Sequence, residues 1–130
     1  MLVGGVALIQ RGQGPAQISL VQLISNPEKF DGREVMLEGF LRLEFEGNAL
    51  YIHQEDDSHN LTKSAIWVNA TPEMLKNRDR LDGHYVLLVG TFNSKQFGHM
   101  RLFAGELDQI KRAEIWPSRA DYEKLRKSAK

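Results

Sequence analysis

The 130-residue chain contains no cysteine. This absence excludes a disulfide scaffold, thiol catalysis and a zinc site with cysteine ligands. A chain of this length buries roughly two-thirds of the surface that it exposes when unfolded, so one core can stabilise it without a metal or a disulfide. We therefore expect a single globular domain and no cofactor.

The chain also lacks an excess of either charge, with 17 basic and 17 acidic residues. No overall field therefore attracts it to nucleic acid or to an anionic membrane. The charges are unevenly distributed, because the 38–57 stretch is acidic and the tail from position 111 is basic. We interpret the basic tail as the solvated face of a helix, and a contact with an anionic partner is the alternative.

Long apolar runs are absent too, since the longest ones fall far short of the ~18 residues that a transmembrane helix needs. The segment Met1–Ile9 is apolar, but it has no basic residues before it and is short for a signal peptide. We interpret it as a first strand or a disordered leader, with a truncated export signal as the alternative. A cytoplasmic location is favoured, and export to the periplasm is left open.

The chain does contain an internal similarity, because the segment Asp31–Leu41 returns 51 positions later as Asp82–Phe92. Each copy places an Asp-Gly turn before a run of alternating apolar residues, and each run has one glycine inside it. A glycine within a strand allows the sheet to bend sharply there. The equivalent positions of Gly39 and Gly90 therefore predict a small, strongly coiled barrel.

The segment before the first of these runs has strong helix signals. Ser19 and Gln22 form a capping box, and Ile18 and Leu23 are placed as a hydrophobic staple. This pattern predicts a linker over 10–17, a helix over 20–25 and a further helical turn over 27–30.

A hairpin is expected next, with an inward-facing apolar pattern over 34–45 and a two-residue turn at Gly47-Asn48. In this register Phe45 points inward opposite Leu50, and Arg42 lies opposite His53. The remaining elements are expected in this order: a polar loop over 54–64, a strand over 65–69, a helix over 72–77, a strand over 85–92, a loop over 93–100, a strand over 101–110 that extends to 115 in the longer alternative, and a helix that begins after Ser118.

The element order resembles that of the oligonucleotide/oligosaccharide-binding (OB) fold, which has a helix between strands three and four of a five-stranded barrel. The lead-in 27–32 and the strings 43–51 and 98–100 are similar to uncharacterised small bacterial OB-like proteins. The resemblance implies a mainly β protein, a five-stranded OB-like Greek-key barrel with short helices at both ends. We expect a leader or extra strand over 1–17, the barrel over 18–116 and a terminal helix over 117–130.

OB-like domains generally bind ligands across the outer face of strands two and three. The predicted register places Tyr51, His53 and Trp67 on that face beside Arg42 and Glu44, where aromatic rings can stack on a ligand. The alternative is that the terminal helix or the leader covers these rings as a second small core. The neighbouring carboxylates disfavour a phosphate backbone, so a protein or a sugar-like ligand fits this face better.

Histidines supply the other candidate sites. His99 lies in a loop that borders the binding face of OB domains, and a capping role is its alternative. The cluster His53, Glu55, Asp56, Asp57 and His59 contains metal-ligating residue types, but its spacing matches no zinc motif such as HExxH. We interpret the cluster as a solvated acidic loop, with a weak divalent-cation site as the alternative.

The sequence therefore predicts a non-enzymatic binding module, since it contains neither a nucleophile elbow nor a phosphate-binding glycine loop. The favoured function is recognition of a protein, as in an inhibitor or an immunity-type partner. Binding of single-stranded nucleic acid or of a saccharide at the same face is one alternative, and a metal-assisted hydrolase using His53, Glu55 and His59 is another. The candidate binding residues are Arg42, Glu44, Tyr51, His53, Trp67 and His99.

Overall fold

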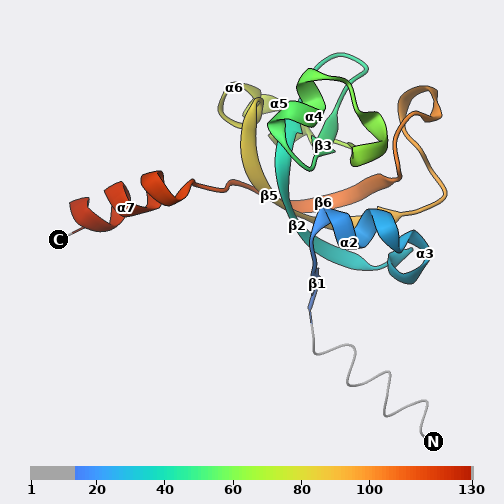
Figure 1. Ribbon diagram of the computed structural model, residues 1–130, viewed down its shortest axis with the longest axis horizontal. Coiled ribbons are helices and arrows are strands. Elements are labelled where there is room, and N and C mark those ends of the chain that lie inside the picture. The colour runs from blue at the N-terminus through green and yellow to red at the C-terminus, as the bar shows by residue number, and fades with distance from the viewer. Residues whose placement is uncertain (1–13, 130) are drawn as a thin grey trace, which may run out of the picture.

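The computed structural model describes residues 14–129, so the segment Met1–Ile9 lies outside the described residues. Within them, five strands close into a barrel (Figure 1). These strands are β2 (Glu34–Arg42), β3 (Ala49–Tyr51), β4 (Ala65–Val68), β5 (His84–Asn93) and β6 (Glu106–Ile115). They pair in the order β2–β3–β4–β6–β5, and β5 pairs with β2 again to close the barrel. The parallel β4–β6 pair and this order confirm the predicted OB-like barrel.

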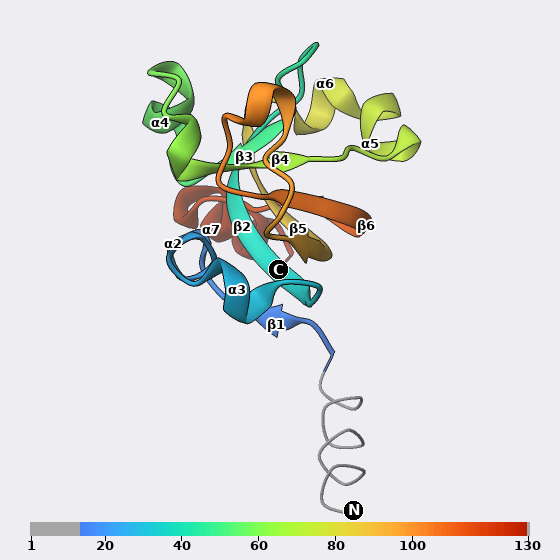
Figure 2. The ribbon, with the colours of Figure 1, turned by 90° about the vertical axis from the view of Figure 1, so that its right-hand side faces the viewer.

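Short helices surround the barrel, and a sixth strand, β1 (Ala16–Gln17), pairs in parallel with β2 inside the predicted linker. The helices are α2 (Leu20–Ser25), α3 (Pro27–Phe30), α4 (Gln54–Ser58), α5 (Pro72–Lys76), α6 (Arg78–Leu81) and α7 (Arg119–Ser128), with 3-10 turns η1 (Thr62–Ser64) and η2 (His99–Arg101). Helices α2 and α3 lie at one end of the barrel, and α5 and α6 lie at the opposite end (Figures 1 and 2).

The internal similarity seen in the sequence extends over two whole units, α2–α3–β2 and α5–α6–β5. Strands β2 and β5 are antiparallel, and Leu37 pairs with Leu88, its own equivalent 51 positions later. The two units are therefore related by an approximate twofold axis that passes near this pair. The Gly32 N–H donates to the Phe92 carbonyl at 2.8 Å, and the Gly83 N–H donates to the Leu41 carbonyl at 2.8 Å.

Each unit also binds the end of the other unit's strand through an aspartate. The Asp31 carboxylate accepts a hydrogen bond from the Ser94 N–H at 2.8 Å, and the Asp82 carboxylate accepts one from the Leu43 N–H at 2.7 Å. Leu43 and Ser94 are again 51 positions apart. Hydrogen bonds from the two Asp-Gly turns therefore join the two halves of the barrel.

The two strand glycines lie where the barrel has no room for a side chain. A Cβ atom on Gly39 would lie 2.7 Å from the Tyr51 carbonyl oxygen, and one on Gly90 would lie 2.8 Å from the Asp108 carbonyl oxygen. Real Cβ atoms do not approach backbone oxygen so closely. This close approach explains why glycine interrupts both apolar runs.

The predicted hairpin register is wrong. Strand β2 ends at Arg42, which pairs with Ala49 and not with His53, and the connecting loop spans 43–48. The Asp82 carboxylate binds the Leu43 N–H and removes it from the ladder, and the Gly47 N–H closes a separate turn on the Glu44 carbonyl at 2.9 Å. Phe45, expected to point inward, is 88% exposed in this loop.

Two other differences concern the long connections. The stretch 54–64 contains α4 and η1 where a polar loop was expected, and His53 precedes α4 as its N-terminal cap residue. Strand β6 begins at Glu106, later than expected, because the residues before it form a loop that folds over the outside of the barrel. Phe103 of this loop is buried and packs on the outer face of the sheet.

Candidate binding surfaces

The outer face of β3 and β4 carries Tyr51 and Trp67, as their alternation with the inward-facing Leu50 and Ile66 predicts. This face is covered. Five residues form a second buried cluster there, against which Trp67 packs: Phe40, Ala49, Tyr51, Ala65 and Phe103. We call it the outer-face cluster.

The cover over the outer-face cluster comes from the β5–β6 loop. The Phe103 ring meets the Trp67 ring edge-on with centroids 5.5 Å apart, and a Cβ atom on Gly98 would lie 2.5 Å from the Trp67 Cβ. Tyr51 is only 4% exposed, and burial is the main cause that raises the pKa of its hydroxyl. The alternative prediction of a second small core is therefore correct for these rings. The terminal helix α7 does not cover it, because α7 has no buried residue.

Arg42 is held between two aspartates from different elements. Its guanidinium lies 2.7 Å from the Asp57 carboxylate of α4 and 3.3 Å from the Asp82 carboxylate of the turn before β5. The hydrogen bond to Asp57 is the main cause that raises the pKa of Arg42. The same guanidinium lies over the Phe40 ring, 5.7 Å from its centroid. Arg42 therefore joins β2, α4 and the Asp82 turn, and its charge is already paired.

The residues of the predicted metal cluster do not converge. The Asp56 carboxylate accepts the His53 N–H at 3.0 Å, and Asp57 is bound to Arg42. Over residues 14–129, no three histidine, aspartate or glutamate side chains gather as a metal site would require. His53 is exposed and borders a shallow hollow with Glu55, Asp56 and Tyr85.

The β2–β3 and β5–β6 loops meet at one edge of the barrel, and they carry the most exposed large apolar side chains described. His99 Nε2 lies 3.5 Å from Glu46 Oε2 and joins the two loops. Phe45 is 88% exposed on one loop, and Met100 is 74% exposed on the other. We call residues 44–46 and 99–102 the rim. It contains Glu44 and His99 of the predicted site.

The backbone of the rim adopts conformations that side chains rarely allow. Glu46, Met100 and Arg101 have φ angles of 56°, 55° and 58°, in the left-handed region. Such conformations cost of order 1 kcal/mol each and persist where the surroundings hold them. The exposure of Phe45 and Met100 was not predicted from the sequence, and the only local signals are the two glutamates beside Phe45 and the Gly98-His99 pair before Met100.

A chain of polar side chains continues outward from Trp67. Its indole N–H donates to the Asn69 side chain at 3.0 Å, and the Asn69 amide donates to Asp108. Burial raises the pKa of Glu106, and a hydrogen bond with Asp108 and the charge of Asp108 raise it further. Sequence reasoning missed this group because the parallel pairing of β4 with β6 brings its members together.

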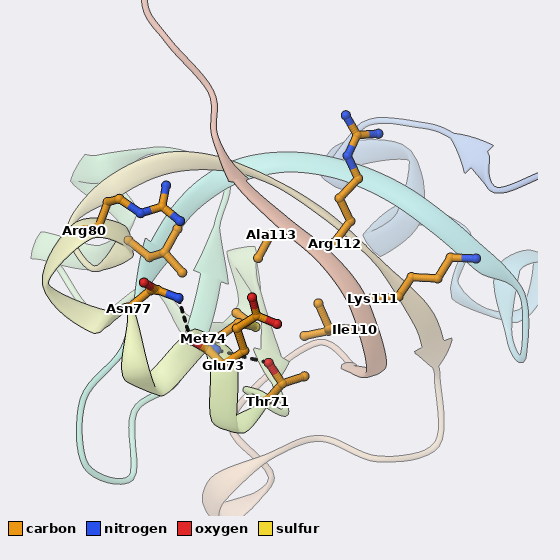
Figure 3. A pocket seen from close by; sticks show the side chains of 10 residues that line it. Thr71, Glu73, Met74, Asn77, Arg80, Ile110, Lys111, Arg112 and Ala113 are labelled. Carbon is orange, nitrogen blue, oxygen red and sulfur yellow. Dashed lines mark hydrogen bonds between the residues drawn. The ribbon is translucent and has the colours of Figure 1, made fainter.

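A small cavity lies between α5, α6 and β6 (Figure 3). Its volume is about 130 Å³, and Met74, Leu81, Ile110 and Ala113 contribute apolar groups to its lining. Figure 3 shows the charged ends of Lys111 and Arg112 pointing away from its centre. The Thr71 hydroxyl accepts the Met74 N–H, and the Asn77 amide donates to the Glu73 carbonyl, so these polar groups already serve α5. Glu73 and Arg80 also line the cavity, but its volume of about 130 Å³ is smaller than the ~300 Å³ of typical ligand pockets.

No helix in the described part of the chain is long and apolar enough to cross a membrane. A scan against protein-family models found no match, and a search of curated proteins found none either. The function must therefore be inferred from the surfaces themselves.

Proposed function

We propose that the chain is a non-enzymatic OB-like binding module that recognises a protein partner through the rim. The observation that carries this proposal is the exposure of Phe45 and Met100 on two loops that the Glu46–His99 contact joins. Aromatic residues and methionine are enriched where proteins meet, and burying such a side chain stabilises a complex by about 1.5–3 kcal/mol.

The chemistry of the rim favours a protein over a nucleic acid. Glu44 and Glu46 flank Phe45 and outnumber Arg101, the single arginine of the rim, so the charge of the rim disfavours a phosphate backbone. A protein surface with an apolar pocket and nearby basic residues complements this arrangement. Met100 adds a flexible side chain that adapts to the shape of a pocket.

The six residues predicted from the sequence divide into rim residues, one residue that supports the rim, and residues outside it. Glu44 and His99 belong to the rim itself. Trp67 supports it from below, since its ring lies 6.4 Å from the His99 ring. Tyr51 and Arg42 stabilise the barrel wall and α4, so we assign them no direct contact with the partner. His53 precedes α4 as its N-terminal cap residue and lies outside the rim.

Site-specific photo-crosslinking tests the proposal. A benzophenone amino acid at position 45 or 100 should capture one partner in the source cells. The same group at Val21 or Leu75, which are also exposed apolar positions, should not capture it. With the partner identified, Phe45→Ser with Met100→Ser should weaken the Kd at least about tenfold. The matched pair Val21→Ser with Leu75→Ser should leave it unchanged. Equal crosslinking at all four positions would contradict the proposal.

Saccharide binding beside Trp67 is a second candidate, favoured by the hydrogen-bonded row Trp67, Asn69 and Asp108. Indole rings stack on sugar rings, while amides and carboxylates bind sugar hydroxyls. With Trp116→Phe, the fluorescence of Trp67 alone reports binding. Saturable quenching by an oligosaccharide would support this candidate, and a flat titration would remove it.

Single-stranded nucleic acid is tested in parallel by the fluorescence anisotropy of labelled oligonucleotides at low salt. The carboxylates of Glu106 and Asp108 are unfavourable neighbours for a phosphate backbone beside Trp67.

A further inference from the structure

Helix α7 has an apolar stripe that no other described element covers. Tyr122 and Leu125 lie three positions apart on one face and are 57% and 62% exposed. Figure 1 shows α7 projecting away from the barrel. A ten-residue helix is marginal in water without a packing partner. The helix and its stripe therefore lack a covering surface within the described part of the chain.

The charge of α7 indicates the kind of surface that it fits. The helix carries four basic residues and two acidic ones: Arg119, Lys124, Arg126 and Lys127 against Asp121 and Glu123. Arg126 pairs with Glu123 at 2.9 Å within the helix. The remaining basic side chains favour an acidic surface that has an apolar floor.

Such a surface lies on the barrel next to the point where α7 leaves it. A groove of about 370 Å³ there has Ile18, Met36, Leu87 and Trp116 as its apolar lining and Glu38 as its acid. We call it the β2–β5 groove, because Glu38 of β2 pairs with Leu87 of β5. Arg112, the cation of the groove, is paired with Glu114.

An acidic hollow adjoins the groove. The Trp116 N–H donates to the Tyr85 carbonyl at 2.9 Å, and Tyr85 lines the neighbouring hollow with Glu55 and Asp56. Trp116 thus marks the border between the groove and this acidic hollow. One copy of the chain therefore presents a basic helix with an apolar stripe and, close to where this helix begins, an apolar groove that adjoins an acidic hollow.

We propose that the chain forms a twofold dimer in which α7 of each copy lies in the β2–β5 groove of the other. The hinge is Trp116-Pro117-Ser118, which directs α7 away from its own barrel. In a twofold exchange both grooves and both stripes are filled at once. The rim lies on another side of the barrel and stays free.

Engineered disulfides test this proposal directly, because the chain contains no cysteine of its own. A Glu38→Cys copy is mixed with a Leu125→Cys copy under mild oxidation. We expect a mixed disulfide of about twice the 14.8 kDa chain mass, and a peptide tag on one of the two copies distinguishes it from disulfides between identical copies. The matched control replaces Leu125→Cys with Leu75→Cys, an exposed leucine on α5, and should give far less product. Equal yields would overturn the proposal.

Light scattering after size-exclusion chromatography provides the second measurement, on the unmodified chain. We expect a dimer that dissociates as salt rises, and Leu125→Asp should weaken its Kd about tenfold or more. A monomer at every concentration would overturn the proposal, and so would a dimer that Leu125→Asp leaves intact. A chain carrying both Glu38→Cys and Leu125→Cys that crosslinks within itself would show α7 folding back on its own barrel, which also overturns it.

Discussion

Gly39 in β2 and Gly90 in β5 lie where the barrel wall leaves no room for a side chain, and each faces backbone as well as apolar side chains. Backbone atoms that are held in a strand ladder cannot move aside without breaking hydrogen bonds. Single residues of this kind decide how tightly the strands coil.

Replacing Gly39 with alanine should therefore destabilise the fold. The new methyl group would meet the Tyr51 carbonyl oxygen, the Leu50 Cγ and the Leu20 Cδ1, all within 2.9 Å. We expect a loss of about 1–3 kcal/mol in the free energy of unfolding, measured by urea denaturation. Gly47→Ala is the matched control, because its neighbour is the flexible Glu44 side chain. Similar losses for both variants would contradict this account.

Glu106 should make stability depend on pH in an unusual direction. Burial and the neighbouring Asp108 raise its pKa, so folding favours the protonated carboxyl. Its contribution is fully present below the ordinary pKa of a glutamate and is lost as the pH rises through the raised value. Glu106→Gln should therefore raise the melting temperature at about pH 7 and change it little at about pH 4.

Asp31 provides the opposite case for comparison. The Ser94 N–H lowers the pKa of Asp31, so this carboxylate stabilises the fold above its ordinary pKa, and the effect is lost as the pH falls. Asp31→Asn should lower the melting temperature at neutral pH, with an effect that fades in acid. Parallel pH profiles for Glu106→Gln and Asp31→Asn would show that these assignments are wrong.

At the scale of elements, the two helix–turn–strand units are built alike. Asn26 and Asn77 donate their side-chain amides to the Gln22 and Glu73 carbonyls at 3.1 and 3.0 Å. Each unit then turns through an Asp-Gly pair and continues into its long strand. Each turn also binds the end of the opposite strand through its aspartate, so the two turns have equivalent structural roles.

This equivalence predicts equal effects at the two turn glycines. Gly32 and Gly83 have φ angles of 76° and 75°, and a Cβ atom would meet nothing closer than 3.8 Å at either position. Only backbone strain then opposes alanine, so Gly32→Ala and Gly83→Ala should each lose about 1–2 kcal/mol of unfolding free energy. Asparagine, which tolerates this conformation, should cost less at both positions. Clearly unequal losses of unfolding free energy, measured by calorimetry, would show that the two turns are not equivalent.

The elements also show which parts of the fold could be predicted from the sequence. Helix α2 was predicted with its correct bounds because its signals are local, as the capping box between Ser19 and Gln22 shows. The barrel order was predicted because alternating apolar runs mark the strands and because Asp-Gly turns precede both β2 and β5. The hairpin register was wrong because Asp82, which ends β2, lies far along the chain. The exposure of Phe45 depends on that register, so half of the rim could not be found.

At the scale of the whole molecule, charge is separated between the parts. The described chain places acidic residues around the β2–β5 groove and α4, and basic residues on α7. The barrel core is complete without α7, because none of the helix residues is buried. Stability of the barrel and association through the helix are therefore separate properties.

A chain that ends after Pro117 should test this separation. At low protein concentration we expect its unfolding free energy to match that of the full chain within about 0.5 kcal/mol, because α7 adds no buried side chain. Association stabilises the folded state by mass action, so the melting temperature of the full chain should rise with protein concentration. That of the shortened chain should stay constant. A large loss of stability at low concentration would mean that α7 packs on its own barrel, whereas an equal concentration dependence in both chains would place the contact between copies elsewhere.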